Sequence, residues 1–192
     1  MGVFGGTFDP VHVGHLVAAT WARQALELDR VLFVVAGQPW QKVGTRAVTR
    51  AEDRYEVVRA AVEGIEGLEA SRLEIERPGP SYTADSVREL AAVDPDVALY
   101  LIVGADVAAD LDSWQRVGEV RDAVTLVVVE RAGLDADADP AGWKVERVRI
   151  PRLDISSSQL RQRLADGRSV QFLVPDAAIR CILRLGLYAG SR

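Results

Sequence analysis

The chain has two histidines, His12 and His15, and both follow the first apolar segment. The adjacent glycines Gly5 and Gly6 precede them and let backbone come close to a ligand without a Cβ in the way. A helix expected to begin here offers unpaired N–H groups and a positive dipole end, which favour phosphate. Because the histidines are three residues apart, their imidazoles can point to one side and stabilise charge on phosphate oxygens. The pattern predicts a phosphate site after the first strand.

A second cluster, closer to the C-terminus, also suits an anion. Three serines occupy positions 156–158 at an expected helix start, and Arg161 follows about one turn later. Ser156 with Gln159 fits a capping box, which is the structural explanation of the cluster. A capped helix start still has N–H groups and a guanidinium that can hold phosphate oxygens, so capping and binding are compatible.

Other chemistry fits these residues less well. Either histidine alone is explained equally by a helix cap, and paired glycines often mark only a turn. Zinc sites need three or four ligands, and the neighbouring sequence has no cysteine or third histidine. The dinucleotide fingerprint G-x-G-x-x-G is missing, because the next glycine after Gly6 is Gly14. The sequence therefore disfavours a metal centre and hydride transfer.

Short β-branched runs alternate with longer amphipathic segments, which is typical of an α/β fold with strand-helix-strand units. We expect a Rossmann-like parallel sheet with helices on both faces. The absence of repeats and linkers predicts a single domain over 1–192. The expected strands are 1–4, 31–36, 73–76, 97–103, 124–129 and 145–150, the last at a sheet edge. The expected helices are 16–28, one after a capping box of Thr49 and Glu52, 83–92, 106–120, 156–165 and 175–185.

Composition limits the partners and the compartment. The net charge is -5 and no stretch concentrates Lys and Arg, so a nucleic acid polymer is not expected. No run is long enough to cross a bilayer, which predicts no membrane partner. The single Cys181 lies at helical spacing among apolar residues and is expected to be a buried free thiol, which fits a reducing cytoplasm. The acidic segment 133–142 is expected to be a solvated loop. The sequence leaves the oligomeric state open, a homo-oligomer included.

The motifs together resemble the bacterial nicotinate-mononucleotide adenylyltransferases of the T/HxGH nucleotidyltransferase superfamily. The resemblance covers almost the whole chain in order. It rests on Gly5 to His15 and Ile155 to Arg161, and it extends through Pro39 to Lys42, Ser81 to Asp85, Gly104 to Asp106 and Leu111 to Trp114.

That resemblance implies transfer of the adenylyl group of ATP to nicotinate mononucleotide, with nicotinate adenine dinucleotide and pyrophosphate as products in NAD biosynthesis. Mg²⁺ would arrive with ATP. The residues implied for ATP are Gly5, Gly6, Thr7, Phe8, His12, His15, Gly104, Asp106, Ile155, Ser156, Ser157 and Arg161. Those implied for nicotinate mononucleotide are Lys42, Tyr82, Thr83 and Trp114, and the catalytic set is His12, His15, Lys42 and Arg161.

The residues implied for nicotinate mononucleotide also have purely structural explanations. Trp114 can be a core aromatic, Thr83 an N-cap and Lys42 a solvated loop lysine. Two other functions also stay open from sequence: the same chemistry on another acceptor such as pantetheine phosphate, and a non-catalytic nucleotide-binding module. The set of Trp40, Thr83 and Trp114 favours a pyridine nucleotide, and retention of both histidines, Arg161 and Lys42 favours catalysis.

Overall fold

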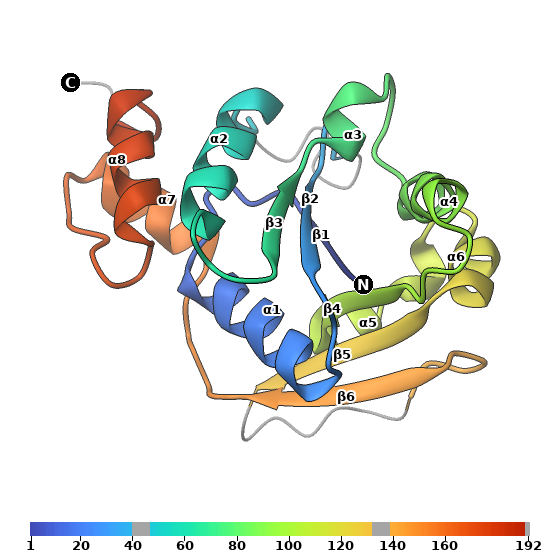
Figure 1. Cartoon of the computed structure of the whole chain (residues 1–192). Coiled ribbons are helices and arrows are strands. Elements are labelled where there is room, and N and C mark those ends of the chain that lie inside the picture. Colours follow the sequence, from blue (N-terminus) through green and yellow to red (C-terminus); the bar gives the residue numbers. More distant parts are fainter. Residues whose placement is uncertain (40–46, 132–138, 191–192) are drawn as a thin grey trace.

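One parallel sheet organises the computed structural model, which describes residues 1–39, 47–131 and 139–190 (Figure 1). Its strand order is β3-β2-β1-β4-β5-β6, so the sheet grows in one direction from β1 to β3 and in the other from β4 to β6. Ligands bind such sheets at the carboxyl ends of the strands beside this switch point, here between β1 and β4. The strands are β1 Gly2–Gly6, β2 Val31–Val35, β3 Leu68–Ser71, β4 Tyr100–Gly104, β5 Thr125–Arg131 and β6 Val145–Ile150.

Helices cover both faces of the sheet, and the strand residues alternate between them (Figure 1). Val31, Phe33 and Val35 of β2 pack into one core with α1 Val13–Ala25, α2 Ala51–Val62, α7 Ser157–Ala165 and α8 Asp176–Arg184. Leu32 and Val34 pack into the other core with α4 Thr83–Val93, α5 Ala105–Ala108, the 3-10 helix η2 Leu111–Ser113 and α6 Val117–Ala123. The expected α/β fold with helices on both faces is confirmed. The near-continuous apolar strands are explained by burial on both sides.

The sequence placed most elements correctly within a few residues, and it was wrong about 73–76. The strand that pairs with β2 is Leu68–Ser71, whereas Leu73–Glu76 forms the short helix α3. Four alternating residues cannot distinguish a strand from one helical turn, and here pairing with β2 decides. The helix expected over 106–120 is instead three short pieces, α5, η2 and α6, with the chain turning at Trp114 to Arg116.

Helix caps, the free thiol and the edge strand agree with the sequence in part. The capping box at Thr49 is wrong, because Arg50 is the N-cap residue of α2 and makes no side-chain cap bond. The cap at Ser156 is confirmed by a bond from the Gln159 N–H to its Oγ at 3.2 Å. Cys181 is buried, and β6 lies at the sheet edge as expected. Residues 132–138 of the acidic segment lie outside the described residues. Within the described part of the chain, no helix is long and apolar enough to cross a membrane.

Candidate active site

A cavity of about 430 Å³ lies at the carboxyl ends of β1 and β4, at the switch point. It brings together three segments that are far apart in sequence: the loop after β1, the start of α4 with the Trp114 segment, and the start of α7. Most residues predicted from the sequence line it, namely Gly5, Gly6, Thr7, Phe8, His15, Tyr82, Thr83, Gly104, Trp114, Ser156, Ser157 and Arg161.

Three predicted residues of the described ranges are not part of this lining. His12 lies behind His15, and its side chain is buried. The Asp106 carboxylate folds over Gly104, where a Cβ added to that glycine would lie 2.6 Å from Oδ1. Ile155 packs against the hydrophobic core. Lys42 lies outside the described residues.

The two histidine rings form a stack in which His15 faces the cavity. Their centroids are 3.7 Å apart with an interplanar angle of 24°. The His12 backbone N–H donates to His15 Nδ1 at 3.1 Å, so a neutral His15 carries its proton on Nε2. The Phe8 ring meets the His15 ring edge-on at 5.1 Å. These contacts orient the imidazole so that Nε2–H can serve as a donor to a ligand oxygen.

The carbonyl groups of the loop after β1 point to donors of the protein. Gly6 O accepts from the Ala36 N–H at 3.0 Å, and Thr7 O accepts from Arg54 Nη1 at 2.7 Å. In a trans peptide the C=O and N–H groups point in opposite directions. The N–H groups of Thr7 and Phe8 therefore point away from these donors. The loop presents donors rather than acceptors to a ligand, which suits an anion.

Side chains at the start of α7 also donate to carbonyl groups of the loop after β1. Ser157 Oγ donates to Pro10 O at 2.9 Å, and Arg161 Nη1 donates to Asp9 O at 2.7 Å. Arg161 Nη2 also donates to Ser158 Oγ at 3.0 Å. The guanidinium thus lies in the cavity wall and fixes the loop after β1 at the same time.

Arg54 is a residue that the sequence reasoning missed. It is the largest fully buried side chain, with 1% exposure, and it extends from α2 beneath the loop after β1. Besides Thr7 O, it donates to Ala36 O at 2.6 Å and Thr49 O at 2.8 Å. A buried guanidinium is tolerated only where such acceptors surround it. The available signal was a charged residue at helical spacing with Val57, Val58 and Ala61, on the buried face of α2.

Asp9 and Tyr188 form a second buried pair that the sequence did not reveal. The Tyr188 hydroxyl donates to Asp9 Oδ1 at 2.8 Å, and Asp9 is 1% exposed. Burial, with the Asp9 charge beside it, raises the pKa of the Tyr188 phenol, so the phenol stays protonated and remains a donor. The pair joins the C-terminal end of the chain to the loop after β1 across 179 positions, a contact that no local pattern can indicate.

The opposite wall of the cavity is built from the start of α4. Tyr82 is its N-cap residue and Thr83 its first helical residue, so the alternative of Thr83 as N-cap is wrong. Ser81 holds this start to the segment that follows β2, because its Oγ accepts from the Gln38 N–H at 3.1 Å and its N–H donates to Gln38 O at 3.0 Å. A helix start with a hydroxyl suits a carboxylate, and the nearby Trp114 indole offers a flat surface to a ring.

Within the described ranges, no group of three or more His, Cys, Asp or Glu side chains is arranged to hold a metal ion. The cavity can instead hold an anionic ligand at the histidine end and a ring with an acidic substituent at the Trp114 end.

Comparisons with known proteins show which proteins this chain resembles. A cytidylyltransferase-like family model matches residues 3–163. Proteins from Saccharopolyspora erythraea (43% identical, 100% of this chain and 90% of theirs) and Thermus thermophilus (44% identical, 98% of both) carry the name probable nicotinate-nucleotide adenylyltransferase. The fold is similar to that of Plasmodium falciparum nicotinic acid mononucleotide adenylyltransferase in complex with NaAD, with a TM-score of 0.77 and 19% identity over 97% of this chain and 96% of that one.

Proposed function

We propose that this chain, which belongs to the cytidylyltransferase-like family, transfers the adenylyl group of ATP to nicotinate mononucleotide. The products are nicotinate adenine dinucleotide and pyrophosphate, a step of NAD biosynthesis. The names of relatives that are 43% and 44% identical over almost the whole chain support this acceptor.

The observation that carries the proposal is the pairing of two unlike ends in one cavity. At one end, His15, Arg161 and the loop after β1 offer donors to phosphate oxygens. At the other end, Thr83 at the start of α4 and the Trp114 indole suit an aromatic carboxylate. An adenylyl transfer to a pyridine nucleotide needs both ends at once.

The reaction is an in-line displacement without a covalent enzyme intermediate. A 5′-phosphate oxygen of nicotinate mononucleotide forms a bond to the α-phosphorus of ATP, and the bond from that phosphorus to the bridging oxygen breaks. Pyrophosphate leaves with the electron pair. The attacking phosphate is already ionised at neutral pH, so no general base is needed, and the enzyme contributes positioning and charge stabilisation.

Each end of the cavity has a defined task in this step. His15, oriented by His12, donates from Nε2 to oxygens on which charge increases in the transition state. Arg161 and Ser157 hold the far end of the triphosphate. Gly104 and Asp106 are assigned to the ATP ribose from the resemblance alone. Tyr82, Thr83 and Trp114 hold the pyridine ring and its carboxylate. Lys42 is assigned to the acceptor phosphate from the motif alone.

Mg²⁺ fits this site as an ion that arrives on the triphosphate. It keeps most of its waters and uses substrate phosphates as ligands, so it requires no carboxylate cage from the protein. When bound, it neutralises part of the triphosphate charge. We also assign the chain to the cytoplasm, because the buried thiol of Cys181 fits a reducing compartment.

The test is a pyrophosphate-release assay with ATP and each of two acceptors, nicotinate mononucleotide and pantetheine phosphate. We expect turnover with the first acceptor only. Turnover with pantetheine phosphate alone would assign the chain to another acceptor, and no release with either would make it a nucleotide-binding module.

A further inference from the structure

The acceptor end of the cavity is the part that we assign to the pyridine ring of nicotinate mononucleotide. Its two walls come from different parts of the chain. One is the start of α4 with Tyr82 and Thr83, and the other is the segment of Trp114 and Gln115 between η2 and α6. A ring bound against the indole fits only if the spacing of these walls is fixed. Ala84 and Val87 of α4 share a hydrophobic core with Leu111 and Trp114, and a polar contact just outside the cavity also joins the two walls.

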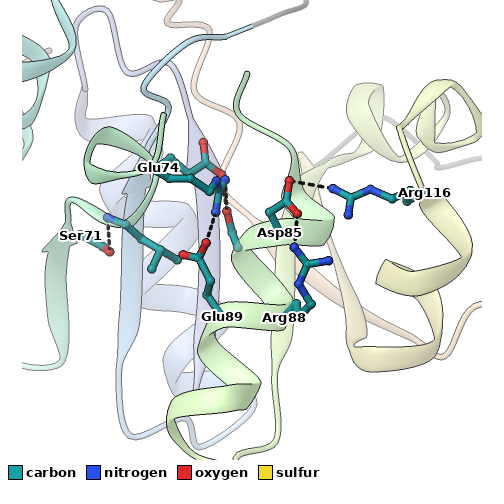
Figure 2. A network of polar contacts seen from close by, with 9 residues as sticks. Ser71, Glu74, Asp85, Arg88, Glu89 and Arg116 are labelled. Carbon is teal, nitrogen blue, oxygen red and sulfur yellow. Dashed lines mark hydrogen bonds and ion pairs between the residues drawn. The ribbon is translucent and has the colours of Figure 1, made fainter. Parts of the chain in front are cut away.

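Asp85, in the first turn of α4, makes this contact (Figure 2). Its Oδ2 lies 2.7 Å from Nη2 of Arg116, the residue that follows Trp114 and Gln115. Its Oδ1 accepts from Arg88 Nη2 at 2.5 Å, a contact within α4 itself. The Asp85 side chain is 16% exposed, against 35% for Arg116 and 62% for Arg88. One carboxylate therefore makes an ion pair between the two walls and another within one wall.

Arg116 has an unusual backbone conformation. Its backbone is left-handed, with φ 54° and ψ 41°, at the N-cap position where the chain turns into α6. A side chain other than glycine adopts this conformation only where its surroundings favour it. Its guanidinium carbon lies 6.0 Å from the centre of the Tyr82 ring. The guanidinium thus contacts the α4 wall while its backbone sets the course of the Trp114 wall.

The charges around Asp85 keep its carboxylate ionised and therefore paired with Arg116. The Arg116 guanidinium, assisted by Arg77 and Arg88, holds the pKa of the Asp85 carboxyl below its ordinary value, so the carboxylate stays charged at neutral pH. Because Arg116 is paired with Asp85, its charge is compensated before any substrate arrives.

We propose that the Asp85–Arg116 ion pair positions the Trp114 wall against the start of α4 and thereby sets the affinity for the pyridine ring of the acceptor. Both are positioning residues, which act through Trp114 and Thr83 rather than by touching the substrate. The inference rests on the proposed function, because it names the acceptor end of that same cavity.

The proposal is tested with Asp85→Asn, Arg116→Gln and the double variant. Apparent KM values are measured for nicotinate mononucleotide, nicotinamide mononucleotide and ATP, together with kcat. We expect each single variant to raise the KM of both mononucleotides roughly fivefold, the size expected for a partly exposed pair. The KM for ATP and kcat should change less than twofold. The double variant should match the singles, because one interaction is lost in all three.

The matched control is Arg88→Gln. It removes the other partner of the same carboxylate, on the same helix, and leaves the contact to Arg116 intact. It should leave all three KM values unchanged. A control that raises the acceptor KM as much as Arg116→Gln would overturn the proposal, since the link between the walls would not be the cause.

Two further outcomes also contradict it. A direct contact of Arg116 with the substrate carboxylate predicts that Arg116→Gln weakens nicotinate far more than nicotinamide mononucleotide. Unchanged acceptor KM in a folded Arg116→Gln protein means that the pair has no positioning role. Asp85→Asn can disturb the start of α4, so Arg116→Gln, which keeps Asp85, decides the question. An unmodified protein without turnover refutes the proposed function instead, so the two failures are distinguishable.

Discussion

At the end of β1 buried charged groups fix the cavity wall, whereas the charged contact between α4 and the Trp114 segment, beside their shared apolar core, is a partly exposed ion pair. Arg54 and Asp9 are each 1% exposed. Arg54 donates to the loop that we assign to phosphate, and Asp9 is part of this loop. Across the cavity, Arg116 is 35% exposed. Buried hydrogen-bonded charges are costly to disturb, while exposed pairs contribute about 1 kcal/mol or less.

This difference matches the two tasks. Charge stabilisation in a transition state requires donors that do not reorganise during the reaction, and a rigid loop over a buried guanidinium provides them. Ring binding needs only a surface at the right spacing, which a partly exposed ion pair between the two walls can maintain. We therefore expect substitutions at the phosphate end to affect stability and turnover strongly, and substitutions at the acceptor end to affect affinity moderately.

The largest effect is expected from Arg54→Met. It removes the donor to the carbonyl groups of Thr7, Ala36 and Thr49, and the longer bond to Gly37 O, at a residue that is 1% exposed. This should lower the free energy of unfolding by about 3 kcal/mol. Chemical denaturation measures the loss. Arg59→Met is the matched control, because Arg59 lies on the same helix, is half exposed and pairs with Glu56 three residues earlier. Equal losses for the two variants would show that the buried guanidinium does not fix the phosphate end.

His15→Ala should lower kcat about 100-fold, because the donor to the transition-state charge is lost. His12→Ala should act in the same direction through the orientation of His15, and the double variant should lose less than the product of the singles. Steady-state turnover of folded variants, checked by thermal melting, measures this. A folded His15→Ala protein with near-normal kcat would remove the residue from the reaction.

Arg161→Ala should raise the KM for ATP about tenfold and change that for nicotinate mononucleotide by less than twofold. The reason is that its guanidinium lies at the phosphate end and also holds Asp9 O. Arg163→Ala is the control from the same helix, since its guanidinium binds Ser169 O instead of the loop after β1. Equal changes in both KM values for Arg161→Ala would mean that the start of α7 does not belong to ATP alone.

Local patterns were sufficient for the fold and for the motif residues. The alternation of apolar strands and amphipathic helices predicted the parallel sheet. The paired histidines and the Ser156 to Arg161 cluster each predicted an anion site, and the structure brings His15 and Arg161 into one cavity. The resemblance added the acceptor residues, of which Tyr82, Thr83 and Trp114 line the same cavity.

The contacts that hold these residues could not be predicted, because they join distant positions. Tyr188 reaches Asp9 across 179 residues, and Arg54 reaches Thr7 across 47. The strand assigned to 73–76 failed for a related reason, since the pairing of β3 with β2 is decided by the sheet rather than by four residues. The sequence predicted which side chains could do chemistry, and the structure shows the contacts that hold those of the described residues.

The most direct test is the ratio of kcat/KM for nicotinate and nicotinamide mononucleotide in the unmodified protein. A carboxylate accepts from every donor at the start of α4, whereas a carboxamide would turn an NH₂ toward those donors, a mismatch of about 1 to 3 kcal/mol. We predict a preference for nicotinate of roughly tenfold to a hundredfold or more. Equal kcat/KM values for the two acceptors would contradict the assignment of Thr83 and the α4 start to a carboxylate.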